Sequence, residues 1–228
     1  MAMSPEVFQE VETATCLLSG MSSVASRISR AILSVLFFIR FGILLLGYKT
    51  IWLDEEKDFI CNSTRLLCMP SCFDEFLPIS SFNLFALQIV ALLTHSLCVA
   101  CFARSAIQAR EGWLQAQLRR KKVQFNLHVI GLLSRMLIEV LFILTYFKVT
   151  EGFVHQKTIH CRSTLCEKSV ICTDINSTVK NIFSLCLCAA SATSAMVCLW
   201  ELVASFPVMQ NINQPASTTQ VQWKKQHF

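Results

Sequence analysis

The sequence predicts an all-α membrane protein, a bundle of four transmembrane helices with disulfide-stapled extracellular loops. The chain of 228 residues is 54% hydrophobic and only 15% charged, with a mean hydropathy of +0.51, which is too apolar for an ordinary soluble domain. Four stretches reach the roughly 20 apolar residues that a helix needs to cross a bilayer. The polar segments after the first and third stretches each carry three clustered cysteines.

Residues 1–30 are predicted to form a cytoplasmic N-terminal helix. Val7, Val11, Ala14 and Leu18 follow the spacing i, i+4, i+7, i+11, which places them on one face of a helix. Such a helix fits either the inner membrane surface or the mouth of a channel, and the periodicity does not choose between them. Acidic residues precede any basic one, unlike the basic start of a cleaved signal peptide, so we expect this segment to be retained.

The four predicted spans are residues 31–52, 82–103, 127–149 and 182–209. The segment 104–126 carries six basic residues against the single acid Glu111. The basic residues are Arg104, Arg110, Arg119, Arg120, Lys121 and Lys122. By the positive-inside rule this segment is cytoplasmic and contacts anionic lipid. Both ends of the chain then lie in the cytoplasm, segments 53–81 and 150–181 face outside, and residues 210–228 form a polar tail that we expect to be flexible.

The cysteines of the two outer loops predict disulfides. They are Cys61, Cys68 and Cys72 in the first loop and Cys161, Cys166 and Cys172 in the second. An oxidising compartment favours disulfides, and the spacings within these two loops lack the paired Cys-x2-Cys knuckles of a zinc site. Six cysteines allow about 15 pairings, but an odd number in each loop requires at least one bridge between loops if all are oxidised. The other six cysteines lie in or near apolar segments.

Four charged residues interrupt the apolar spans: Arg40 in the first, Arg135 and Glu139 in the third, and Glu201 in the fourth. Each costs about 2.5–3.5 kcal/mol at mid-bilayer if it faces lipid, so we expect all four to face protein or water. Arg135 and Glu139 share a helix face at i, i+4, and Arg40 supplies a second cation for Glu139 or Glu201. These residues form either intramembrane ion pairs that join helices or the lining of a transport path.

Four carboxylates follow the first span, at Asp54, Glu55, Glu56 and Asp58. They set an electrostatic field for cations entering a pore, bind Ca²⁺ weakly, or form a solvated rim. No EF-hand spacing is present, and we predict no other cofactor or metal.

The sequence contains no motif that predicts an enzyme. The histidines are scattered, and Gly-x-Ser-x-Gly, His-Glu-x-x-His and phosphate-binding glycine loops are absent. His95 lies within the second span, where it makes either a helix contact or a titratable gate. The net charge of +5 is small and its basic residues are clustered, so nucleic acid is not an expected partner.

Several motifs resemble the connexins, the subunits of gap-junction channels. The first loop has the spacing Cys-x6-Cys-x3-Cys and the second Cys-x4-Cys-x5-Cys. Trp52-Leu-Asp54-Glu55 is similar to the entry of the first connexin loop, and Arg135-x-x-x-Glu139 to the third helix. The resemblance also includes Arg40 in the first helix and Glu201 in the fourth, and it covers residues 32–201.

The resemblance implies a homo- or hetero-hexamer with other connexins around an aqueous pore in the plasma membrane, docked to an apposed hexamer on a neighbouring cell at a gap junction. Ions and small solutes then pass between the cells. It implies three loop disulfides, Cys61 with Cys172, Cys68 with Cys166 and Cys72 with Cys161. It also implies that the N-terminal segment folds into the pore, and that Lys49, Asp54, Glu55 and Asp58 line it.

The departures from the connexin pattern concern gating and docking. Leu66-Leu67 replaces a usual Pro-Gly, His95 replaces a usual proline, the N-terminal tryptophan is missing, and the N-terminal segment is about eight residues longer than usual. Lys168 replaces a docking asparagine. Asn62 and Asn176 begin glycosylation sequons that put glycans where partners meet. We therefore hypothesise selective docking or an undocked hemichannel; a non-conducting four-helix adhesion or scaffold protein is the alternative, although claudin and tetraspanin motifs are absent.

Overall fold

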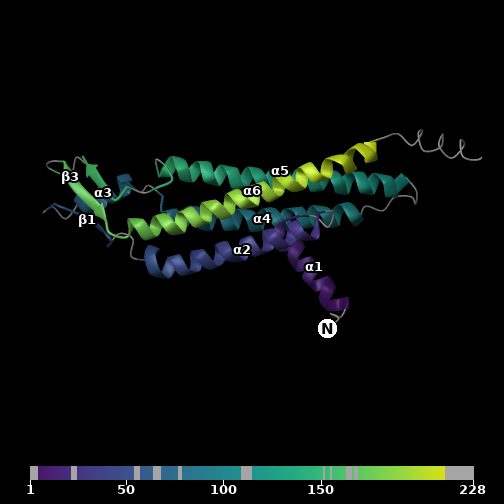
Figure 1. Ribbon diagram of the computed structural model, residues 1–228, viewed down its shortest axis with the longest axis horizontal. Coiled ribbons are helices and arrows are strands. Elements are labelled where there is room, and N and C mark those ends of the chain that lie inside the picture. Colours follow the sequence, from purple (N-terminus) through teal and green to yellow (C-terminus); the bar gives the residue numbers. More distant parts are fainter. Residues whose placement is uncertain are drawn as a thin grey trace, which may run out of the picture.

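Four long helices lie side by side in the computed structural model, with a small sheet at one end and a short N-terminal helix that projects sideways from the bundle (Figure 1). The structure describes residues 5–21, 25–53, 57–63, 68–76, 79–108, 115–150, 152–154, 156–162, 166 and 169–213. The long helices are α2 (Arg27–Gly47), α4 (Ser81–Gln108), α5 (Gln115–Val149) and α6 (Ser177–Asn213). Each belongs to a segment long and apolar enough to cross a membrane, so the predicted fold class is confirmed.

The helices extend beyond the predicted spans. α2 begins at Arg27 because Ser26 caps it, its hydroxyl accepting from the Ser29 N–H. α5 begins at Gln115, so the predicted cytoplasmic loop 104–126 is partly helical; its basic residues and glutamines are good helix formers. α6 continues through Pro207 to Asn213, so residues 210–213 of the predicted flexible tail are helical, and residues 214–228 lie outside the described residues. Proline removes one backbone hydrogen bond but does not end this helix.

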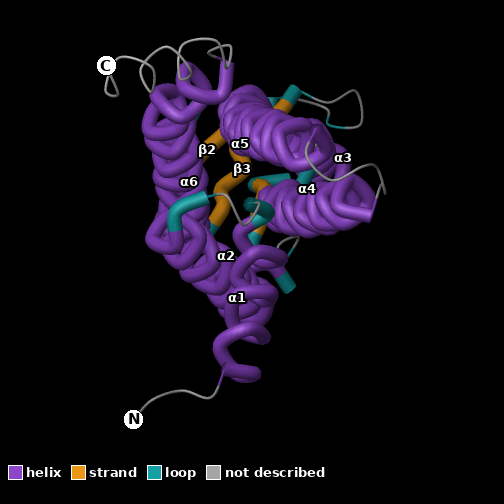
Figure 2. The backbone as a smooth tube through the Cα atoms, turned by 90° about the vertical axis from the view of Figure 1, so that its right-hand side faces the viewer, coloured by secondary structure: helices purple, strands orange, loops and turns teal. Residues whose placement is uncertain are grey.

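The N-terminal helix α1 (Pro5–Ser19) includes the predicted helical segment 7–18. It ends at Gly20, whose φ of +62° is a left-handed conformation that favours glycine after a helix. Viewed along the bundle, α1 lies on the side of α2, and α5 lies on the opposite side of the bundle (Figure 2). The N-terminal helix therefore projects from one face of the bundle, beside the start of α2.

The two predicted extracellular loops fold together into one cap. Its strands are β1 (Phe59–Cys61), β2 (Thr158–Cys161) and β3 (Val170–Asp174), and they form an antiparallel sheet in the order β1-β3-β2. Helix α3 (Cys68–Phe76) packs on this sheet through Phe73 and Phe76, whose rings contact the buried ring of Phe59. The central strand thus belongs to the second loop and pairs with a strand of the first.

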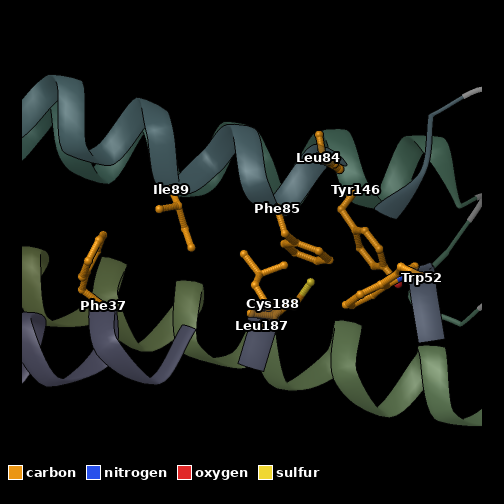
Figure 3. Close-up of a cluster of buried hydrophobic side chains, with 9 residues drawn as sticks. Phe37, Trp52, Leu84, Phe85, Ile89, Tyr146, Leu187 and Cys188 are labelled. Atoms are coloured by element: carbon orange, nitrogen blue, oxygen red, sulfur yellow. The ribbon is translucent and has the colours of Figure 1, made fainter. Parts of the chain in front are cut away.

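The bundle core is aromatic near its outer end (Figure 3). Phe85 of α4 contacts Tyr146 of α5, and Leu187 and Cys188 of α6 complete the cluster. Trp52 belongs to the π-helical turn η1 (Tyr48–Trp52) that follows α2. Its indole occupies the space where any side chain at Gly47 would lie. The wide turn therefore directs Trp52 back into the core instead of into solvent.

Candidate functional site

Three disulfides connect the two halves of the cap. They join Cys61 to Cys172, Cys68 to Cys166 and Cys72 to Cys161, which is the pairing that the resemblance implies. Cys61 lies directly opposite Cys172 in the sheet, while the other two bridges attach α3 to the second loop. Because every bridge runs between the loops, the cap is one covalently closed unit. The bonded sulfurs offer no thiolate to a metal.

Polar contacts fix the edge of the cap that meets the bundle. The Asn176 side-chain amide donates to Asp58 at 2.8 Å, and the buried Lys180 ammonium pairs with Asp174 at 3.0 Å. Asn176, predicted to face a docking partner or to carry a glycan, is thus half-buried and bonded within its own chain. Asn62, at the end of β1, is exposed. Of the two sequon asparagines, Asn62 is the more exposed.

Of the residues predicted to line a pore, Lys49 and Asp58 lie in the described part of the chain. Lys49 is exposed on η1, at the outer end of α2. Asp58 is half-buried and accepts the hydrogen bond from Asn176. Asp54 and Glu55, together with the predicted docking residue Lys168, lie outside the described residues.

A buried polar cluster joins all four long helices at mid-bundle. The Arg40 guanidinium of α2 donates to both oxygens of Glu139 of α5, at 2.9 and 3.0 Å, and to the Ala190 carbonyl of α6 at 2.7 Å. Gln88 of α4 donates to Glu139 at 2.7 Å and to the Ser191 hydroxyl at 3.0 Å. Arg40 is 3% exposed and Glu139 is fully buried within the single chain. This geometry favours the interpretation as a helix-joining cluster over a transport path.

Arg135 and Glu201 were expected in ion pairs, and within the described residues neither forms one. Arg135 donates instead to the Ser19 carbonyl, at the C-terminus of α1. Glu201 accepts from the Ser26 N–H at 2.7 Å and from the hydroxyls of Ser26 and Ser29 at 3.0 and 2.7 Å. The prediction was wrong because both charges serve helix ends: a cation stabilises the C-terminus of α1 and an anion the N-terminus of α2.

We call residues 19–30 the α1–α2 junction. Besides the hydrogen bonds of Arg135 and Glu201, Arg30 of α2 donates to the Cys16 sulfur of α1 at 2.9 Å. A side chain at Gly20 would collide with the Ser96 hydroxyl, at 2.5 Å, and with Arg135. The last turn of α1 is therefore held from α2, α4 and α5, whereas the described residues Glu10 and Val11, earlier in this helix, are exposed.

Sequence reasoning did not assign roles to Gln88, Ser191, Ser26 and Ser29. The signal for Ser26 was present, since a serine ahead of an apolar run is typical of an N-cap. Gln88 is a lone amide inside an apolar stretch, which marks it as a residue that needs a buried partner. His95, open between a helix contact and a gate, lies 2.6 Å from the Ser134 hydroxyl of α5, which favours the helix contact.

A comparison with protein families identifies a match over the first half of the chain. The family model described as Connexin matches residues 10–125, just over half of the chain. The matched region runs from α1 through α2, β1, α3 and α4 into the first part of α5. It contains the first-loop cysteines, Arg40 and Gln88, but not the second loop or α6.

Proposed function

Since this chain belongs to the connexin family, a family of gap-junction channel subunits and not of enzymes, we propose that six copies, alone or with other connexins, surround an aqueous pore in the plasma membrane. The pore passes ions and small solutes. Two such hexamers on adjacent cells dock through their caps, which gives a gap junction.

The observation that carries this proposal is the closed cap. Docking two hexamers end to end requires a rigid surface, and three bridges between the loops restrict the motion of the sheet. The exposed apolar side chains of the long helices, such as Trp200 at 72% and Leu46 at 65%, suit contacts with lipid and neighbouring subunits. Such a surface does not suit a chain that is alone in water.

The position of α1 supports a pore on the α2 side. This helix projects from α2, away from α5 (Figure 2), so a central axis on that side places α1 inside the channel. Lys49, at the outer end of α2, then faces the same axis, and we assign Asp54, Glu55 and Asp58 to the outer entrance. Clustered carboxylates there favour cations and bind Ca²⁺ weakly.

The exposed Asn62 favours a second candidate function, an undocked hemichannel. A glycan on Asn62 stands at the end of an outer strand, where it keeps two caps apart. At Asn176, by contrast, a glycan would have to attach to the nitrogen that donates to Asp58. The two candidate functions therefore differ in whether Asn62 is glycosylated: a glycan there favours the hemichannel, and its absence favours the gap junction.

Whole-cell recording tests both candidates. We would express the chain alone in single cells and in cell pairs, and record while external Ca²⁺ is lowered and restored. Coupling between paired cells supports the gap junction, and Ca²⁺-sensitive current in single cells without coupling supports the hemichannel. Silence in both, with surface expression shown by biotinylation, contradicts the channel proposal and favours a non-conducting adhesion or scaffold role.

The variant Asn62→Gln sharpens this experiment. If the glycan blocks docking, the variant gains coupling between paired cells and runs faster on a gel than the wild-type chain. Ser63→Ala is the matched control, because it changes the neighbouring residue and leaves the Asn-x-Thr sequon intact. Coupling that is equal in all three chains contradicts the role given to Asn62.

A further inference from the structure

A cavity of about 650 Å³ lies beneath the cap, between α3, the outer end of α5 and β2. Its volume is in the range of sites for small molecules, about 300–1,000 Å³. Phe76, Leu141, Leu144 and Ile159 supply apolar walls, and Glu75 and Lys148 lie at its charged edge. We call it the cap–bilayer cavity. Neither the channel proposal nor the family resemblance assigns it a role.

The cavity lies at the outer end of a helix segment long and apolar enough to cross a membrane. Lys148 is next to the last residue of the span Lys122–Val149. Leu141 lies seven residues earlier in the same helix, so it is about 10 Å deeper along the helix axis. A ligand that fills the cavity therefore needs a polar end at the depth of Lys148 and an apolar end at the depth of Leu141. Membrane phospholipids have this shape.

The charged edge indicates the kind of headgroup. Glu75 and Lys148 are both exposed and of opposite charge, and the structure gives neither side chain a hydrogen bond or ion pair among the described residues. An anion alone would suit Lys148 and be repelled by Glu75. A zwitterionic headgroup suits both, because its phosphate meets the ammonium and its own cation meets the carboxylate.

The apolar wall continues along the membrane. Leu137, Leu141 and Leu144 follow the spacing i, i+4, i+7 on α5, and their side chains are 51–57% exposed. They make a continuous apolar track that leads from the cavity toward mid-bilayer. An acyl chain on this track remains within the hydrocarbon layer along its whole length.

We propose that the cap–bilayer cavity binds one zwitterionic phospholipid of the outer leaflet. The phosphate lies at Lys148, the headgroup cation lies at Glu75, and an acyl chain runs along Leu144 and Leu141. The bound lipid connects the cap to α5 at the membrane surface. The cavity is formed by one subunit, so this assignment does not depend on whether hexamers dock.

The first test uses the full chain in nanodiscs of phosphatidylcholine that contain a phosphatidylcholine with a photoreactive diazirine in its acyl chain. Crosslinked peptides are identified by mass spectrometry. We expect labelling of residues 141–149, and we expect Leu144→Trp to reduce it about tenfold because the indole fills the space of the chain. Ile182→Trp is the matched control, since Ile182 is equally exposed, at 56% against 55%, lies near the outer end of α6 and does not line the cavity.

Two results would overturn the assignment of a phospholipid. An equal loss of labelling in both tryptophan variants would mean that the probe reports only the surrounding bilayer. Labelling of this segment by a photoreactive sterol, without labelling by the phosphatidylcholine, would give the cavity a different occupant. Size-exclusion profiles that match the wild type show that each variant is folded.

The second test addresses the headgroup. The chain is purified from nanodiscs of equal phosphatidylcholine and phosphatidylglycerol, and the retained lipid is identified by native mass spectrometry. We expect phosphatidylcholine to be preferred, and Glu75→Gln to lower that preference about threefold, as for an exposed ion pair. Asp74→Asn, a neighbouring exposed carboxylate outside the cavity lining, is the control. Preference for phosphatidylglycerol in the wild type, or equal effects of both variants, would overturn the zwitterionic assignment.

Discussion

The outer and inner ends of this molecule are held by different chemistry. At the outer end, three disulfides close the cap. At the inner end, the α1–α2 junction depends on the hydrogen bonds that Arg135 donates and Glu201 accepts, both residues belonging to neighbouring helices. Covalent bridges fix a surface permanently, whereas a few hydrogen bonds allow two positions that differ by a few kcal/mol. A docking surface needs the first property, and a helix that moves in a channel mouth needs the second.

Removing one bridge of the cap should have the largest effect. The double variant Cys68→Ala/Cys166→Ala deletes a disulfide whose cysteines are both buried, and we expect a loss of about 2–5 kcal/mol in stability, enough to reduce folding at 37 °C. Surface biotinylation measures the fraction of the protein that reaches the plasma membrane. Cys98→Ala, at an exposed and unbridged cysteine of α4, should reach the surface normally. Normal surface levels of the double variant would show that the other two bridges suffice.

Glu201→Gln should have the next largest effect, at the inner end. Hydrogen bonds to a charged group contribute about 1.5–3 kcal/mol, and the variant removes the charge that stabilises the N-terminus of α2. We expect the junction to loosen and expose Cys16, which is half-buried against Arg30. The rate at which a thiol reagent applied from the cytoplasmic side modifies Cys16, resolved by peptide mass spectrometry, should rise several-fold.

The control for this measurement is Glu10→Gln. It makes the same chemical change at a glutamate that is exposed on α1, so the modification rate of Cys16 should stay at the wild-type value. A rate that is unchanged in Glu201→Gln, or raised equally in both variants, would contradict the role of Glu201 at the junction.

The contrast between the two ends also decides what the sequence could predict. Apolar length predicted the four spans, and an odd cysteine number in each loop predicted bridges between loops. The partners of Arg135 and Glu201 could not be predicted. The i, i+4 spacing places Arg135 beside Glu139 but gives no information about the Ser19 carbonyl, which competes for the same guanidinium. That carbonyl comes from a helix 116 residues away in sequence. A backbone carbonyl is present in every residue, so the sequence does not mark the one at Ser19 as the partner of Arg135.

The small sheet was not predicted for a similar reason. β1 is three residues long and β3 five, which is too short for alternation to stand out from a polar loop. The long-range pairing of Cys61 with Cys172 stabilises these strands, so the fold of the cap follows from its bridges more than from local strand propensity.

Gly20→Ala tests whether the junction depends on its backbone conformation. A left-handed conformation costs a non-glycine residue about 1–2 kcal/mol, and the added methyl group would also collide with the Ser96 hydroxyl. We expect faster modification of Cys16 than in the wild-type chain. Gly42→Ala is the matched control, because it adds a methyl group within α2 where no atom lies within 4 Å, and it should be neutral or slightly stabilising. If both variants behave as the wild type, the conformation of Gly20 is not what positions α1.

Asn176→Ala should have the smallest effect, although it removes a hydrogen bond as short as those at the junction. The lost bond to Asp58 contributes about 0.5–1.5 kcal/mol, but β1 and β3 remain joined by the bridge between Cys61 and Cys172. The cap should therefore keep its structure, and thermal unfolding of the purified variant should shift by only a few degrees. Asn62→Ala, at an exposed asparagine with no side-chain hydrogen bond among the described residues, is the control, and it should not shift when all chains are measured after removal of N-glycans. A loss as large as that of the disulfide variant would mean that hydrogen bonds hold the cap as they hold the junction, and the contrast between the two ends would fail.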